Sequence, residues 1–175
     1  MITKDNNLRV MELFFKNPSR KFHLREIARL TRLSSTGVIK LVARLKKENL
    51  LISKKSKITH QIVPAFERRF PSMKRVYNLY SLYDTGLVHY LTKLYEQPRA
   101  IIVFGSYADG TDTEKSDVDI AVINDKNHPH DLMRFEKMLS RKIRIHVVNP
   151  HHAKKEFLNS LANGIVLQGF AEVIE

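Results

Sequence analysis

Two aspartates separated by a single residue are the side chains in this sequence best suited to chemistry. They lie in Asp117-Val118-Asp119, at the start of a β-branched run that predicts a strand over residues 117–123. Side chains alternate along a strand, so both carboxylates are expected on one face, about 6–7 Å apart at the backbone. Two such carboxylates repel each other and attract a divalent cation. Because Mg²⁺ commonly takes one or two carboxylates together with substrate phosphates, we expect Asp117 and Asp119 to bind Mg²⁺ or Mn²⁺.

A Gly-Ser pair upstream supplies groups that can hold a phosphate. Gly105 and Ser106 follow residues 100–104, an apolar β-branched run that predicts a buried strand. Glycine lets the chain turn tightly and approach a ligand with bare backbone. Ser106 offers a hydroxyl and an amide where a helix is expected to begin, which suits nucleotide binding. Phosphates held in this way beside a carboxylate-bound metal ion indicate phosphoryl or nucleotidyl transfer.

The spacing of these residues resembles the signature of a known enzyme superfamily. Gly105-Ser106, ten further residues and then Asp117-Val118-Asp119 are similar to the motif of the nucleotidyltransferases that share the DNA polymerase β palm, most of all the minimal prokaryotic type. The resemblance covers residues 97–175, including a helix-to-strand ending at residues 163–169. It implies a small mixed sheet flanked by helices, a nucleoside triphosphate (NTP) as substrate, and transfer of a nucleoside monophosphate to a hydroxyl.

The sequence departs from this family's pattern at the third catalytic position. The resemblance implies a third carboxylate on the next strand, which we expect at residues 142–148. By alternation, Lys142, Arg144 and His146 share one face of that strand. His146 takes the expected place of the carboxylate, with Arg144 as the neighbouring alternative. A neutral histidine can act as a general base, which would make His146 catalytic alongside the aspartate pair. In the opposite interpretation His146 is an inert replacement, and the site binds nucleotide without transferring it.

The chain is strongly basic, and the excess charge lies in its first third. The formal net charge is +12, of which residues 1–65 carry +11. A like-charged surface of that size suits a polyanion such as nucleic acid, with a solvated basic surface as the alternative. The same segment predicts three helices and then two short strands, over residues 5–15, 23–30, 36–49, 50–53 and 58–63.

This order of elements resembles the winged-helix variant of the helix-turn-helix. In that fold the third helix enters the major groove of duplex DNA, and the hairpin, or wing, touches the backbone or the minor groove. Short hydroxyl side chains at the start of the third helix would reach phosphates or base edges, and basic side chains on its polar face and at the wing tip would contact phosphates. The DNA-binding residues that the resemblance implies are Ser35, Thr36, Lys40, Arg44, Lys54, Lys55 and Lys57.

Together these segments predict a two-domain α/β (α+β) protein. We expect a winged-helix domain over residues 1–65, a helical connector over 66–96 and a minimal nucleotidyltransferase domain over 97–175. In one hypothesis the protein is a Mg²⁺-dependent nucleotidyltransferase whose winged helix locates nucleic acid or regulates its own operon. In the other it is a DNA-binding transcriptional regulator whose degenerate C-terminal domain senses nucleotide. The resemblance also leaves open an antitoxin-like relative with a toxin as protein partner, and a homodimer.

Composition excludes several further classes of protein. The sequence has no cysteine, which rules out a disulfide scaffold, a cysteine nucleophile and a thiolate zinc site. No apolar run approaches the roughly 20 residues that cross a bilayer. We therefore expect a soluble, cytoplasmic protein with no membrane partner.

Overall fold

The computed structural model describes residues 5–55 and 60–171, which form two compact units. The first unit ends at Lys74 and the second begins at Arg75, so the division falls inside one helix, α4 (Phe70–Asp84). Helices and two separate sheets are combined along the chain, consistent with the expected α+β class. Within the described ranges, no helix is both long enough and apolar enough to span a membrane.

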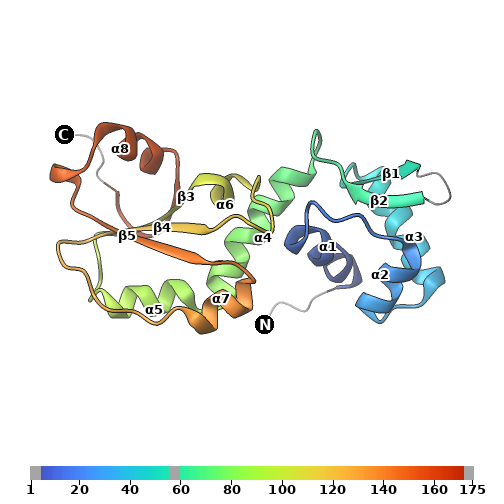
Figure 1. The fold of residues 1–175 in the computed structure, drawn as a ribbon, viewed down its shortest axis with the longest axis horizontal. Coiled ribbons are helices and arrows are strands. Elements are labelled where there is room, and N and C mark those ends of the chain that lie inside the picture. Colours follow the sequence, from blue (N-terminus) through green and yellow to red (C-terminus); the bar gives the residue numbers. More distant parts are fainter. Residues whose placement is uncertain (1–4, 56–59, 172–175) are drawn as a thin grey trace. The chain divides into compact units, whose positions relative to one another are not determined.

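Three helices and a hairpin make up the N-terminal unit, in the order expected (Figure 1). The Ser34 hydroxyl accepts a hydrogen bond from the Gly37 amide at 3.1 Å and so caps the third helix. Apolar side chains at helical spacing turn inward from each helix, among them Phe14, Ile27 and Val38, all fully buried. The elements are α1 (Asn6–Lys16), α2 (Leu24–Thr31), α3 (Ser35–Lys47), β1 (Leu51–Lys55) and β2 (His60–Pro64).

The first strand of the hairpin extends two residues further than the sequence predicts. Antiparallel pairing continues from Leu51 opposite Pro64 to Lys55 opposite His60. The expectation that Lys54 and Lys55 belong to the connecting turn is therefore wrong, because both lie within β1. Their side chains are exposed, and lysines are well tolerated on an edge strand such as β1. Lys57, the third lysine of the expected wing tip, lies outside the described residues.

A four-stranded mixed sheet forms the centre of the C-terminal unit. The spatial order of its strands is β5-β4-β3-β6. β3 runs antiparallel to β4 and to β6, whereas β4 and β5 are parallel. Parallel neighbours need a crossover connection, and α7 (Met133–Leu139) lies within it. The strands are β3 (Ala100–Phe104), β4 (Val118–Ile123), β5 (Ile143–Val148) and β6 (Ile165–Gly169).

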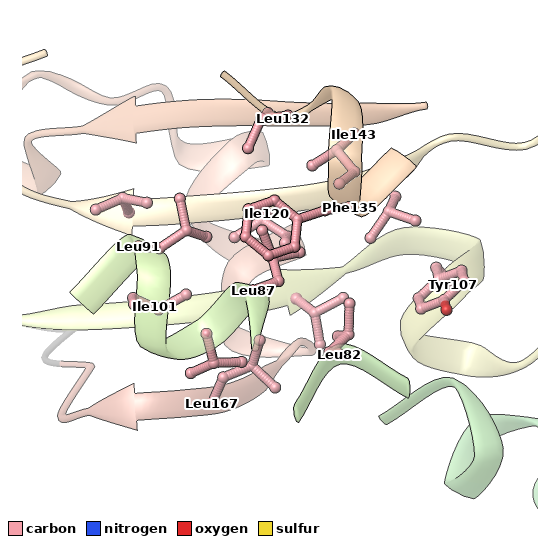
Figure 2. Packing of buried hydrophobic residues seen from close by; sticks show 14 of the residues in the cluster. Leu82, Leu87, Leu91, Ile101, Tyr107, Ile120, Leu132, Phe135, Ile143 and Leu167 are labelled. Atoms are coloured by element: carbon pink, nitrogen blue, oxygen red, sulfur yellow. The ribbon is translucent and has the colours of Figure 1, made fainter. Parts of the chain in front are cut away.

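Helices cover both faces of this sheet (Figure 1). On one face, α5 (Leu87–Leu94) and α7 pack on the strands through a buried cluster to which Leu91, Ile120 and Phe135 belong (Figure 2). On the other face, Leu161 of α8 (Lys155–Ala162) belongs to a smaller buried cluster with side chains of β3 and β4. Two short helical turns complete the unit, α6 (Gly105–Asp109) directly after β3 and η1 (Pro150–His152) before α8.

Candidate functional site

The Gly-Ser pair and the aspartate strand lie beside each other where β3 ends. Phe104, the last residue of β3, pairs with Asp119 across the antiparallel β3–β4 ladder. Gly105 follows with φ at 69°, in the left-handed region that favours glycine. A Cβ at Gly105 would lie 3.6 Å from Asp119 Oδ2, so this carboxylate passes close to the backbone at the turn. The structure therefore brings Gly105 and Ser106 next to Asp119.

The two aspartates share one face, as their spacing predicts. Asp119 is the second residue of β4, and Asp117 directly precedes the strand. Val118 and Ile120 point to the opposite face and are fully buried in the core. The side chains of Asp117 and Asp119 are 23% and 28% exposed, so both carboxylates remain open to a ligand.

Both carboxylates reach across to side chains of β5. Asp117 Oδ2 lies 2.6 Å from Nη2 of Arg144, and Asp119 Oδ1 lies 3.4 Å from Nε2 of His146. In the parallel β4–β5 pairing, the backbone of Asp119 lies opposite Arg144. The Asp119 carboxylate therefore points along the strand toward His146, which is two residues further along β5. Where the resemblance implies a third carboxylate, the site has a guanidinium and an imidazole. At least one of its two negative charges is thus compensated by Arg144.

Aromatic rings surround His146 and set the orientation of its imidazole. Ring centroids lie 5.4 Å away for Phe104 on β3 and 5.7 Å away for Phe157 on α8. The two phenyl rings also contact each other, edge to face, at 5.6 Å. His146 and Phe157 line a pocket of about 340 Å³, together with residues 147–149, 152 and 153. A molecule in this pocket would lie beside the imidazole, next to Asp119.

A buried polar network anchors the loop between Ser106 and Asp117. The Asn78 side-chain amide donates to Asp112 Oδ1 at 2.7 Å and to the Tyr107 carbonyl at 2.9 Å. Arg141 Nη2 lies 3.4 Å from Asp112 Oδ2, and the side chains of this ion pair are 4% and 0% exposed. Burial and the nearby Asp112 charge raise the pKa of the Tyr107 hydroxyl. The network fixes the loop that separates the phosphate-binding candidates from the aspartate pair.

The donor set limits what metal the site could hold. Within residues 5–55 and 60–171, no three His, Cys, Asp or Glu side chains are grouped closely enough to bind a metal ion together. Two carboxylates on one face fit a single Mg²⁺ or Mn²⁺, which takes its remaining ligands from water and substrate phosphates. A second ion held by a third carboxylate does not fit, because Arg144 and His146 occupy that side.

In the N-terminal unit the described DNA-binding candidates are all exposed. Ser35 and Thr36 open α3, Lys40 lies one turn further, and Arg44 one turn beyond that. Arg44 Nε also donates to Glu48 Oε1 at 2.8 Å, which partly neutralises its charge. The Lys46 ammonium donates to the Ser53 hydroxyl at 3.0 Å and so joins α3 to β1. α3 and the first strand of the hairpin therefore present basic side chains together.

The sequence alone does not predict several residues of the C-terminal site. Arg144 stands out in the sequence only as a stand-in for a carboxylate, and its ion pair with Asp117 depends on how β4 and β5 are aligned. In the sequence, Phe157 is recognisable only as an apolar residue of a helix, with no sign that it contacts His146. Asn78, Asp112 and Arg141 come from three distant segments, and a buried role for such polar residues leaves no pattern in the sequence.

Comparison with known protein families gives a match within the C-terminal unit. Residues 87–169, just under half of the chain, match the protein family described as Polymerase beta, Nucleotidyltransferase. The match begins at α5, earlier than the resemblance in the sequence, and ends with β6. It includes the Gly-Ser pair, the aspartate pair and His146, and it supports a nucleotidyltransferase domain in this part of the chain. No curated protein sequence matches the chain.

Proposed function

We propose that the protein binds duplex DNA through its N-terminal unit and transfers a nucleoside monophosphate from an NTP to a hydroxyl acceptor at its C-terminal unit. The observation that carries the second part is the placement of Gly105 and Ser106 beside Asp119, with Asp117 on the same face, inside the segment that matches a nucleotidyltransferase family. Bare backbone, a hydroxyl and two carboxylates are the groups that nucleotidyl transfer requires.

Each residue of the site has a role in this proposal. Backbone at Gly105 approaches the triphosphate, and the Ser106 hydroxyl donates to a phosphate oxygen. Asp117 and Asp119 would hold Mg²⁺ or Mn²⁺, which when bound neutralises phosphate charge. In the tautomer that carries its hydrogen on Nε2, His146 donates to Asp119, and Nδ1 is then available to accept the proton of the acceptor hydroxyl.

Removal of both carboxylates tests the proposed metal site. With Asp117→Asn and Asp119→Asn combined, we expect metal-dependent NTP binding to disappear, because amide side chains keep the shape but lose the two negative charges. Calorimetric titration of each of the four NTPs, in Mg²⁺ and again in EDTA, measures the effect.

Asp125→Asn combined with Asp131→Asn is the matched control, since these two carboxylates are exposed and belong to the loop that follows β4. The control should bind like the wild type. Equal metal-dependent affinity in the wild type and the Asp117/Asp119 variant would contradict the proposed site.

A second candidate function is nucleotide sensing without transfer. The ion pair between Asp117 and Arg144 favours it, because the guanidinium neutralises a carboxylate that transfer would need for a metal ion. In this case the protein is a transcriptional regulator, and NTP changes its affinity for DNA. By linkage, DNA must then change its affinity for NTP by the same factor.

One pair of assays separates the two candidates. Radiolabelled NTP is incubated with candidate hydroxyl acceptors, and a DNA titration is run with and without NTP. Transfer by the wild type removes the sensing-only function, whereas clear coupling without transfer removes the enzyme. If neither is seen, both fail, and an antitoxin-like role that needs a toxin as partner is the one to test.

The basic face of α3 supports the DNA-binding half of the proposal. Residues 1–65 carry a formal charge of +11, and α3 and β1 expose six basic side chains outside the hydrophobic core, Lys40, Arg44, Lys46, Lys47, Lys54 and Lys55. Three helices followed by an antiparallel hairpin are the elements of a winged helix. We propose that α3 enters the major groove and that Lys54 and Lys55 on β1 contact phosphates.

Loss of basic side chains from α3 should weaken DNA binding in a salt-dependent way. For Lys40→Ala with Arg44→Ala, we expect lower affinity for duplex DNA and a plot of log K against log salt that is shallower by about 2, because each lost phosphate contact removes about 0.9 from the slope. Fluorescence anisotropy over a series of salt concentrations gives both quantities.

Lys154→Ala with Lys155→Ala removes the same charge from exposed positions at the start of α8 and serves as the control. It should leave the slope unchanged. Equal losses in the two variants, or binding that is insensitive to salt, would count against α3 as the DNA-contacting helix.

A further inference from the structure

An apolar side chain stands on the otherwise polar face of α3. Ile39 is 53% exposed, while its neighbours along the helix Val38 and Val42 are buried. Thr36 and Ala43 lie three residues before and four residues after Ile39, so the three share one side of the helix. Both are exposed. Ile39 and Ala43 thus form a short apolar strip where a purely electrostatic surface would carry charge.

Basic side chains flank this strip. Lys40 and Lys47 adjoin Ile39 and Ala43 on the helix surface and are exposed. Single exposed apolar residues are common on protein surfaces and need no explanation by themselves. The position of Ile39 is informative because it lies among the cationic side chains that the proposed function directs to DNA phosphates. A helix held in the major groove by such contacts turns the side chains between them toward the base edges.

The chemistry of Ile39 restricts which base it can recognise. Its side chain neither donates nor accepts a hydrogen bond, and the same holds for Ala43. In the major groove the bases present hydrogen-bond donors and acceptors, and thymine alone adds an apolar C5-methyl group. Against any other base edge, Ile39 would cover a polar group without satisfying it, which costs free energy.

We propose that Ile39, with Ala43 one turn further along α3, reads thymine methyl groups in the major groove. Ile39 is then a specificity-determining residue, and the preferred site has A·T pairs beneath the middle of α3. This inference rests on the proposed DNA binding. The flanking lysines give affinity for any duplex, whereas Ile39 gives preference among duplexes.

Replacement of thymine by uracil tests this directly, because it removes the methyl group and leaves the hydrogen-bonding edge intact. A duplex is first selected from a random-sequence library with the full-length protein. Its affinity is then compared with that of the same duplex made with uracil, for wild type, Ile39→Ala and Val76→Ala. Val76 is an exposed β-branched residue on α4, 59% accessible, and serves as the control.

For the wild type we expect the uracil duplex to bind more weakly by about fourfold for each methyl group lost from apolar contact. Ile39→Ala should show a smaller difference between the two duplexes than wild type does, because Ala43 keeps its contact and the shorter side chain at position 39 loses most of its own. Val76→Ala should behave as wild type does. Circular dichroism checks that each variant keeps its helices.

Two results would overturn the inference and leave DNA binding intact: equal affinity of wild type for both duplexes, or a thymine preference in Ile39→Ala that is as large as that of wild type. A selected site without A·T pairs would do the same. If no duplex binds at all, the proposed DNA-binding function fails together with the inference.

Discussion

Replacement of His146 by alanine is expected to slow nucleotidyl transfer by about 10²–10⁴-fold, the usual contribution of a general base. NTP affinity should change little, because the proposed contacts with the triphosphate come from Gly105, Ser106 and the aspartate pair. The loss would therefore fall on the rate of the chemical step. Single-turnover transfer from radiolabelled NTP, at saturating nucleotide, measures that rate.

Two further variants sharpen the His146 experiment. His146→Asp places a carboxylate where the resemblance implies one, so it should retain or raise activity. His152→Ala alters another histidine that lines the same pocket and should leave the rate near that of wild type. An unchanged rate in His146→Ala would remove the general-base role, and a similar loss in His152→Ala would mean that the pocket, and not the imidazole, matters.

Removal of Asp112 is expected to destabilise the protein by about 3–5 kcal/mol, because removing one partner of a buried ion pair is strongly destabilising. In Asp112→Ala the Arg141 guanidinium, with a side chain only 4% exposed, would lose that partner. The Asn78 amide would lose a hydrogen bond as well. Urea denaturation should show a lower midpoint with the dependence on urea unchanged.

An exposed ion pair provides the comparison for Asp112. Lys142 Nζ lies 3.0 Å from Glu136 Oε2, and the Lys142 side chain is 77% exposed. Lys142→Ala should cost less than about 1 kcal/mol, as is usual for exposed pairs. If Asp112→Ala proves no more destabilising than Lys142→Ala, the buried pair does not hold the loop. Asp112→Asn, which keeps the size of the side chain, gives a second measurement should the alanine variant fail to fold.

The sequence predicts the aspartate face of the site because that face depends on local alternation. Asp117 and Asp119 point one way and Val118 and Ile120 the other, as period-two spacing requires. The closeness of Gly105 to Asp119 was accessible only through the family resemblance, since it depends on which strands pair. Local sequence patterns give the wrong answer for the hairpin lysines. Lys54 and Lys55 are residue types common in turns, yet backbone pairing with β2 keeps them in a strand.

Long-range contacts account for what the sequence could not predict. Arg144 meets Asp117 because β4 and β5 are parallel with a particular alignment, which no local pattern encodes. Charged residues are ordinarily expected at the surface, so nothing marked Asp112 and Arg141 as buried partners. Their burial becomes visible only when α4, the loop after α6 and the turn after α7 are brought together.

Because β5 lies at the edge of the sheet, Arg144 also affects whether other chains can pair with this strand. Among the described strands β5 is the outermost on its side of the sheet, so one row of its backbone amides and carbonyls has no neighbouring strand. Such a row can template the stacking of further chains, above all where the side chains are apolar and β-branched, as Ile143, Ile145 and Val147 are. A charged side chain that stays 67% exposed, as Arg144 does, disfavours such stacking on an edge strand. The residue that pairs with Asp117 in the candidate site is thereby also expected to disfavour association of the protein through this sheet edge.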